Sequence, residues 1–290
     1  MSFTNDIKER ISSVEFDCEY CKLAALAALM RFGGRLSETG AYISTESAAV
    51  ARFGQRLLAD ALAISCEPVY YENQKLWRIS LNEEQSAVCA TELAADGDVM
   101  QILPFECCRR AFLTGAFLGG GGVSDPKKGY HLELDTKKDE YAARAAEVLA
   151  LFGIHAKIIE HKSRYVVYVK DYESVADVLG LIGADFAALE LFSVSVEKQV
   201  RNDINRQVNC ESANMRKLGF AASQQLAAIK KIQKKVGLGV LSEPLREIAE
   251  VRLAYPDDSL KELGGRLTPP IGKSGVNHRL ARIIDYAKTL

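Results

Sequence analysis

The 290-residue sequence has no long hydrophobic run and no strong net charge, and we expect no secretory leader. Its longest uncharged apolar stretch, Leu23 to Met30, is far shorter than the roughly 20 residues that a membrane-spanning helix needs, so no membrane partner is expected. The first residues, MSFTNDIKER, do not place an apolar core behind a basic start, as a secretory signal would. A chain that is 48% hydrophobic and 26% charged is typical of globular proteins and not of disordered or collagenous ones. We therefore expect a cytoplasmic protein of about two domains.

The spacing of the cysteines along the chain does not favour a metal site. The seven cysteines are an odd, scattered set, which in a reducing compartment indicates free thiols: 18, 21, 66, 89, 107, 108 and 210. Cys18 and Cys21 form one C-x-x-C, but no second pair and no Cys or His partner follows at zinc spacing, and a tetrahedral site needs four ligands. We expect the side chains of Cys107 and Cys108 to point apart. The pattern favours helical cysteines near a core over a metal site, so no metal and no cofactor is predicted.

The net charge of −1 hides an uneven distribution along the chain. Residues 201–290 contain 16 Lys and Arg against 9 Asp and Glu, a net charge of +7, whereas residues 1–200 contain 21 against 29, a net charge of −8. A basic C-terminal third beside an acidic body indicates that one module binds a polyanion and the other does not. The alternative is a chance imbalance.

Two segments of the acidic part resemble each other at an offset of 87–90 residues. The first begins with LAALAALMRFGGRL and the second with RRAFLTGAFLGGGGVSD, and each continues into alternating strands, an amphipathic helix and two more strands. The alignment places Tyr42 with Tyr130 and Trp77 with Tyr165. Because the leading helices are rich in Ala and Gly and end in glycines, we expect them to approach closely and to pair on a pseudo-two-fold axis. The alternative is that each is simply a helix in a tight core.

The segment LTGAFLGGG, which starts at Leu113, resembles the LAGLIDADG motif of homing endonucleases, and LAALMRFGG, which starts at Leu26, resembles a weaker copy. In those nucleases the eighth motif residue of each helix is an acid, and the two acids hold Mg²⁺ at the DNA backbone. Here the two positions are Gly33 and Gly120, neither of which can ligate a cation. We therefore predict no catalytic residues and no metal at this site.

The resemblance implies an α+β domain over residues 1–197, made of two αββαββ repeats at about 1–95 and 96–197. The strands of this domain carry acids and few Lys or Arg, so we predict weak or no duplex binding by the N-terminal part and a role as a scaffold or protein-partner surface. An active metal-dependent endonuclease that uses an unrecognised acid such as Asp125 is the competing hypothesis.

Residues 198–220 form the predicted linker between the two domains. They mix Arg, Lys, Asn and Gln with few large apolar residues, which indicates a helix or a helix-loop. Asn205, Arg206 and Asn209 suit hydrogen bonds either to phosphate or between the domains, and both roles stay open.

Residues 221–290 are predicted to fold as an all-α domain with a helix-turn-helix. Apolar spacing and capping residues predict helices at 222–235, from the cap Ser242 to Pro256, at 259–263, and from Ser274 towards Leu290. In a helix-turn-helix the early residues of the second helix face base edges, and free N–H groups at its start favour phosphate. The predicted DNA contacts are Lys273, Ser274, Gly275, Asn277, His278, Arg279 and Arg282. The alternatives are a bundle with a solvated polar face, or a basic surface for an acidic protein partner.

The combination of both parts resembles the WhiA family of bacterial regulators. The stretches that carry the match touch nearly the whole chain: CCRRAFLTGAFLGGGGVSDP, YHLEL, NRQVNCESAN and LGGRLTPPIGKSGVNHRL. The resemblance implies a nucleoid-associated, DNA-binding transcription regulator linked to cell division, chromosome segregation and, in spore formers, sporulation. It also implies that the C-terminal helix-turn-helix makes the main contact with double-stranded DNA.

Overall fold

The chain divides into two compact units. The computed structural model describes residues 2–93 and 98–290; the first unit ends at Lys198, and the second runs from Gln199 to Leu290. The expected border between the two repeats, near residues 95 and 96, lies outside the described residues.

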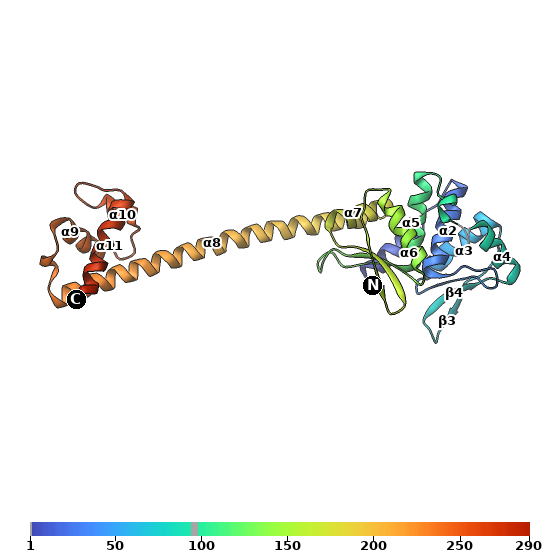
Figure 1. Ribbon diagram of the computed structural model, residues 1–290, viewed down its shortest axis with the longest axis horizontal. Helices are drawn as coiled ribbons and strands as arrows, with labels where there is room; N and C mark the ends of the chain where they lie inside the picture. The colour runs from blue at the N-terminus through green and yellow to red at the C-terminus, as the bar shows by residue number, and fades with distance from the viewer. Residues whose placement is uncertain (1, 94–97) are drawn as a thin grey trace. The chain divides into compact units, whose positions relative to one another are not determined.

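The first unit repeats one α-β-β-α-β-β order (Figure 1). The first copy consists of α2 (Glu19–Gly33), β1 (Gly34–Arg35), β2 (Tyr42–Thr45), α3 (Ala48–Leu62), β3 (Val69–Tyr71) and β4 (Leu76–Ser80). The second copy consists of α5 (Glu106–Gly120), β5 (Gly121–Val123), β6 (Leu132–Thr136), α6 (Asp139–Ala150), β7 (Lys157–His161) and β8 (Arg164–Val169). Around these copies lie α1 (Phe3–Ile11), α4 (Glu83–Glu92), the 3₁₀ turn η1 (Val99–Ile102) and α7 (Tyr172–Leu181). The predicted α+β class and the order of elements are confirmed.

Each copy forms an antiparallel four-stranded sheet, with strand orders β1-β2-β4-β3 and β5-β6-β8-β7. Trp77 pairs with Thr45 and Tyr165 pairs with Thr136, so Trp77 and Tyr165 are equivalent, as predicted.

The predicted equivalence of Tyr42 and Tyr130 is wrong. Tyr42 pairs with Ser80, and the residue in the same register of the second sheet is Glu133, which pairs with Tyr168. The physical reason is a longer connection between the first two strands of the second copy, which shifts the residues of the second strand, β6, relative to those of β2.

Helices α2 and α5 pack against each other through their backbones at the centre of the first unit. A Cβ placed on Gly115 would lie 2.1 Å from the carbonyl oxygen of Ala25, and one on Gly33 would lie 2.8 Å from the Cα of Gly119. Most side chains of both helices are buried in one continuous apolar core that includes the inner faces of both sheets. The expected pairing of the two small-residue helices is therefore confirmed, and close contact is the reason for their Ala and Gly content.

A single helix, α8 (Asp185–Lys235), contains residues of both units. The predicted linker at 198–220 is therefore helical, and the helix expected at 222–235 is the last part of α8. The second unit continues with η2 (Leu238–Val240), α9 (Glu243–Ala254), α10 (Leu260–Gly265) and α11 (Lys273–Thr289). Its own core is formed by Ile229, Ile232, Leu245, Ile248, Leu263, Val276, Leu280 and Ile283.

The α2–α5 contact makes a testable prediction for Gly115→Ala. The added methyl group meets the backbone of Ala25, so the helices must separate, and we expect the free energy of unfolding to fall by about 2–3 kcal/mol. In the matched control, Gly180→Ala in α7, the new methyl group meets only a side-chain oxygen of Asp185 at 3.8 Å, and helix propensity predicts a gain of up to about 1 kcal/mol. Denaturant titration followed by the fluorescence of Trp77, the only tryptophan, reports on the first unit. Equal stability of the two variants would contradict the predicted contact.

Candidate nucleic-acid interface

The second unit places α10 and α11 as a helix-turn-helix. Ser259 and Glu262 form a capping box that fixes the start of α10. The chain then turns back, because the N–H of Ile271 donates to the carbonyl oxygen of Gly264 at 3.0 Å. A Cβ on Gly264 would lie 2.2 Å from the carbonyl oxygen of Ile271, so this close approach requires glycine. The turn thereby sets where α11 begins.

The first turn of α11 presents backbone N–H groups and polar side chains. Its N-cap is Gly272, which contributes no side-chain cap, so the free N–H groups of this turn have no side-chain acceptor there. Five of the predicted contact residues are exposed along the first three turns: Lys273, Ser274, Asn277, His278 and Arg282. Their spacing of three, four and five residues keeps them on neighbouring rows of one helix surface. An anion is favoured at such a helix start by the N–H groups and the helix dipole.

Two predicted contact residues are placed differently. Arg279 is half-buried, and its guanidinium contacts the second unit itself: Nη1 lies 3.4 Å from the carbonyl oxygen of Pro244 and 3.9 Å from a carboxylate oxygen of Glu247. Gly275 is half-buried against the side chain of Ile271, so it offers its backbone alone. Arg279 therefore orients α11 against α9 and has fewer N–H groups left for a ligand than Arg282.

Ala281 was not among the residues predicted from the sequence to contact DNA. It is exposed and follows Asn277 by four residues, which places its methyl group on the same surface as the polar cluster. A small apolar group at such a position can contact the methyl group of thymine. The helical spacing from Asn277 was the signal that would have found it.

Two lysines near the C-terminal end of α8 hydrogen-bond to the C-terminal end of α11. Nζ of Lys231 donates to the carbonyl oxygen of Ala287 at 2.8 Å, and Nζ of Lys235 donates to that of Leu290. These lysines satisfy carbonyl groups at the C-terminal end of α11, where the helix dipole favours cations. They hold the C-terminal end of α11 against α8. The exposed polar residues lie at the other end of α11, in its first turns.

The predicted linker contacts Asn205, Arg206 and Asn209 are all exposed on α8. Nη1 of Arg206 lies 3.7 Å from a carboxylate oxygen of Asp203 one turn away. Both roles considered for these residues, phosphate contact and interdomain hydrogen bonding, stay predictions.

In the first unit, the two positions that lack acids are closed by backbone. A Cβ on Gly120 would lie 2.2 Å from the carbonyl oxygen of Asp135, and Gly33 faces Gly119 as described above. A carboxylate at position 33 would require the paired helices to move apart, and one at position 120 would require the backbone of β6 to move away from the end of α5. Among residues 2–93 and 98–290, no group of three or more His, Asp and Glu side chains lies close enough to share a metal ion.

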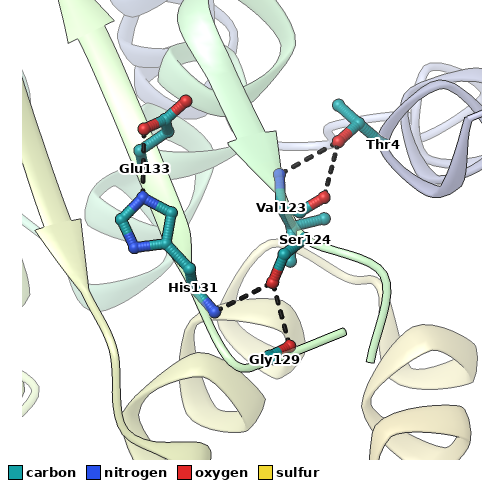
Figure 2. Close-up of polar contacts among 6 residues, drawn as sticks. All are labelled: Thr4, Val123, Ser124, Gly129, His131 and Glu133. Carbon is teal, nitrogen blue, oxygen red and sulfur yellow. Dashed lines mark hydrogen bonds and ion pairs between the residues drawn. The ribbon is translucent and has the colours of Figure 1, made fainter. Parts of the chain in front are cut away.

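A cavity of about 350 Å³ lies at the C-terminal end of α5, lined by Asn5, Lys8, Ser44–Ser47, Leu76 and Gly119–Gly121. Figure 2 shows how α1 is held beside it: the hydroxyl of Thr4 donates to the carbonyl oxygen of Val123 at 2.9 Å and accepts from the N–H of Val123 at 3.0 Å. Lys8 of α1 and Glu46 both line this cavity. Burial lowers the pKa of Lys8 to about 8, and the charge of Glu46 opposes this shift.

The rival catalytic residue, Asp125, has a turn-stabilising role. Its Oδ1 accepts from the N–H of Lys127 at 2.8 Å, and its carbonyl oxygen accepts from the N–H groups of Lys128 and Gly129. The hydroxyl of Ser124, just before this turn, donates to the carbonyl oxygen of Gly129 and accepts from the N–H of His131, as Figure 2 shows. Asp125 thus shapes the connection between β5 and β6.

The cysteines contradict one prediction. The sulfur atoms of Cys107 and Cys108 lie 4.0 Å apart instead of pointing apart, and together with those of Cys18 and Cys21 all four lie within 4.8 Å of one another. Pairing of α2 with α5 brings the two cysteine pairs to one place. Linear spacing could not show this, because zinc spacing rules refer to ligands near one another in the chain.

Comparison with known proteins identifies both parts. Residues 109–201 match the model of the WhiA LAGLIDADG-like domain, and residues 204–287 match that of the WhiA C-terminal HTH domain. The chain is 38% identical over 312 residues to a probable cell division protein WhiA of Clostridium botulinum, with 100% of this chain and 99% of the relative covered. The chain belongs to the WhiA family.

Other WhiA relatives agree with this assignment. The protein of Alkaliphilus oremlandii, also named probable cell division protein WhiA, is 40% identical over 313 residues, with 100% of this chain and 98% of the relative covered. The crystal structure of full-length WhiA from Thermatoga maritima superposes with a TM-score of 0.65 at 27% identity, covering 100% of this chain and 99% of that one. The WhiA fold, with an N-terminal LAGLIDADG domain and a C-terminal helix-turn-helix domain, is therefore the fold of this chain. In the described parts of the chain, no helix is both long and apolar enough to cross a bilayer.

The environment of Lys8 makes a prediction about pH. Its pKa is about 8 in the folded state against 10.5 for a lysine in water, so between these two pH values the unfolded chain holds a proton that the folded chain has lost. Stability from this group therefore rises with pH through that window, and below it the buried charge destabilises the fold. We expect Lys8→Met to stabilise the first unit by about 1–3 kcal/mol at pH 7 and by much less above pH 10.5.

Trp77 fluorescence during denaturant unfolding at pH 7 and at alkaline pH measures this difference. Lys127→Met, at an exposed turn position, is the control, and its effect on the free energy of unfolding should be the same at both pH values. If Lys8→Met changed the free energy of unfolding equally at both pH values, the role of the buried charge would be contradicted.

Proposed function

We propose that this WhiA-family protein binds double-stranded DNA in a sequence-specific manner and acts as a transcription regulator in cell division. The observation that supports this most directly is the exposed polar cluster at the start of α11, on a helix N-terminus without a side-chain cap. Phosphate is favoured at the N–H groups near Lys273 and Ser274, which leaves Asn277, His278 and Arg282 for base edges. Asn pairs with adenine and Arg with guanine in the major groove.

The charges of the two units support different roles for them in binding DNA. The second unit carries a net charge of +7 and the first a net charge of −8, so a polyanion is attracted to one and repelled by the other. The first unit would then serve as a scaffold or as a surface for a protein partner. The resemblance to WhiA extends the proposal to chromosome segregation, to sporulation in spore formers and to a place on the nucleoid.

We propose that the first unit has no nuclease activity. Support comes from Gly33 and Gly120, where backbone contacts exclude the acids of a LAGLIDADG site, and from the use of Asp125 in a turn. Without paired carboxylates, a metal ion at the DNA backbone has no ligands from these helices. Plasmid nicking that depends on Mg²⁺ would favour the nuclease hypothesis instead.

The test uses the full chain and a duplex selected from a random library by binding to it. Asn277→Ala and Arg282→Ala should each weaken binding to the selected site by about 5- to 150-fold, equivalent to about 1–3 kcal/mol, and relax preference at one position. Lys273→Ala should weaken all sequences alike and reduce the slope of log affinity against log salt by about one. Fluorescence anisotropy at several salt concentrations measures both effects.

Lys288→Ala is the matched control, because Lys288 lies on the last turn of the same helix and pairs with Asp285. It should leave affinity and sequence preference unchanged. Unchanged affinity of the Asn277 and Arg282 variants, or binding that no sequence improves over random duplex, would overturn the proposal and leave an acidic protein as the partner of the basic unit.

A further inference from the structure

Four cysteine sulfur atoms meet where helices α2 and α5 begin. Cys18 is the N-cap of α2 and Cys21 lies in its first turn, while Cys107 and Cys108 lie in the first turn of α5. The sulfur of Cys21 lies 3.8 Å from that of Cys108, the sulfurs of Cys107 and Cys108 lie 4.0 Å apart, and all four are within 4.8 Å of one another.

The pairing of the repeats explains this cluster. Helix α2 begins at Glu19 and α5 at Glu106, so Cys21 and Cys108 occupy equivalent positions in the two copies. Residues at equivalent positions of two paired helices meet across the pseudo-two-fold axis, and both of these thiols are buried there. The rings of Tyr20 and Phe105, next to the cysteines, pack edge to face at 6.2 Å between the same two helix starts.

The distances fit a single tetrahedral ion. Zinc–sulfur bonds are about 2.3 Å long, so the edges of a tetrahedral zinc site with four thiolates measure about 3.8 Å. The two printed sulfur distances are close to this edge. A disulfide would bring two sulfurs to about 2.0 Å, and all seven cysteines are free thiols. An iron–sulfur cluster places several iron atoms between its ligands and so holds their sulfurs further apart than one ion does.

The two helix starts also favour thiolates. Both helix N-termini direct their partial positive charge at the cluster. Three of the four cysteines, Cys18, Cys21 and Cys107, line an adjoining cavity of about 410 Å³ together with Arg110.

We propose that Cys18, Cys21, Cys107 and Cys108 bind one Zn²⁺ ion in a structural site. Four protein ligands fill the tetrahedron and leave no open position for substrate, which distinguishes a structural from a catalytic zinc site. Binding replaces the four thiol protons, which go to solvent, and no oxidation occurs. The ion joins the N-terminal ends of the paired helices, at the opposite end from the glycine contact of Gly33 and Gly119.

The experiment is a metal analysis of the full chain, purified with a thiol reductant and without chelator. We expect about one zinc per chain by mass spectrometry, and a loss of more than about tenfold in both Cys107→Ser, at the exposed ligand, and Cys18→Ser. Cys66→Ser, elsewhere in the first unit, and Cys210→Ser, on α8, are matched controls and should retain the ion. Trp77 fluorescence and circular dichroism verify that each variant is folded.

A second measurement keeps the test decisive if a ligand variant does not fold. Addition of Co²⁺ to metal-free wild-type chain should give intense visible bands of a tetrahedral ion and thiolate-to-cobalt charge transfer, saturating at about one equivalent. A chelator should lower the thermal midpoint of the zinc-bound wild-type chain. Wild-type protein that is folded, reduced, free of zinc and without thiolate–cobalt bands would overturn the proposal, as would full zinc content in Cys107→Ser. Neither measurement involves DNA, so the result is independent of the proposed function.

Discussion

The contact between the backbones of α2 and α5 determines the character of the first unit. Small residues along both helices, with Gly115 against Ala25 and Gly33 against Gly119, let the two helices lie closer than ordinary side chains would permit. Because each helix leads directly into its own sheet, this contact also fixes the two sheets relative to each other. One packing constraint therefore organises an apolar core that extends through both repeats.

The same contact has opposite consequences at the two ends of the helix pair. At the C-terminal ends Gly33 lies against Gly119 of the partner helix and Gly120 lies against the backbone of β6, so neither position has room for an acid, and Lys8 lines the cavity beside them. At the N-terminal ends the helices bring two cysteine pairs together. The helix pair thus has glycines at the positions of the LAGLIDADG acids at one end and four clustered cysteines at the other.

Much of this architecture could be predicted from the sequence, because it rests on local patterns. The Ala- and Gly-rich helices, the alternation of the strands and the polar start of α11 each follow from neighbouring residues. Features that depend on distant residues could not be predicted in this way. The residue equivalent to Tyr42 depends on the length of one connection between strands. The contact of Arg279 with α9 and the clustering of the four cysteines both depend on how helices pack. The repeat offset of 87 residues, which equals the separation of Cys21 and Cys108, was the one sequence signal for that meeting.

We propose that the second unit reads DNA while the paired-helix unit does not. Hydrogen–deuterium exchange of the full chain, with and without a 30-base-pair duplex at low salt, locates the contact without knowledge of the target sequence. We predict slower exchange in the turn after α10 and in the first turns of α11, with no change in β1–β8 of the first unit. Slower exchange confined to those strands, with α11 unchanged, would contradict the claim.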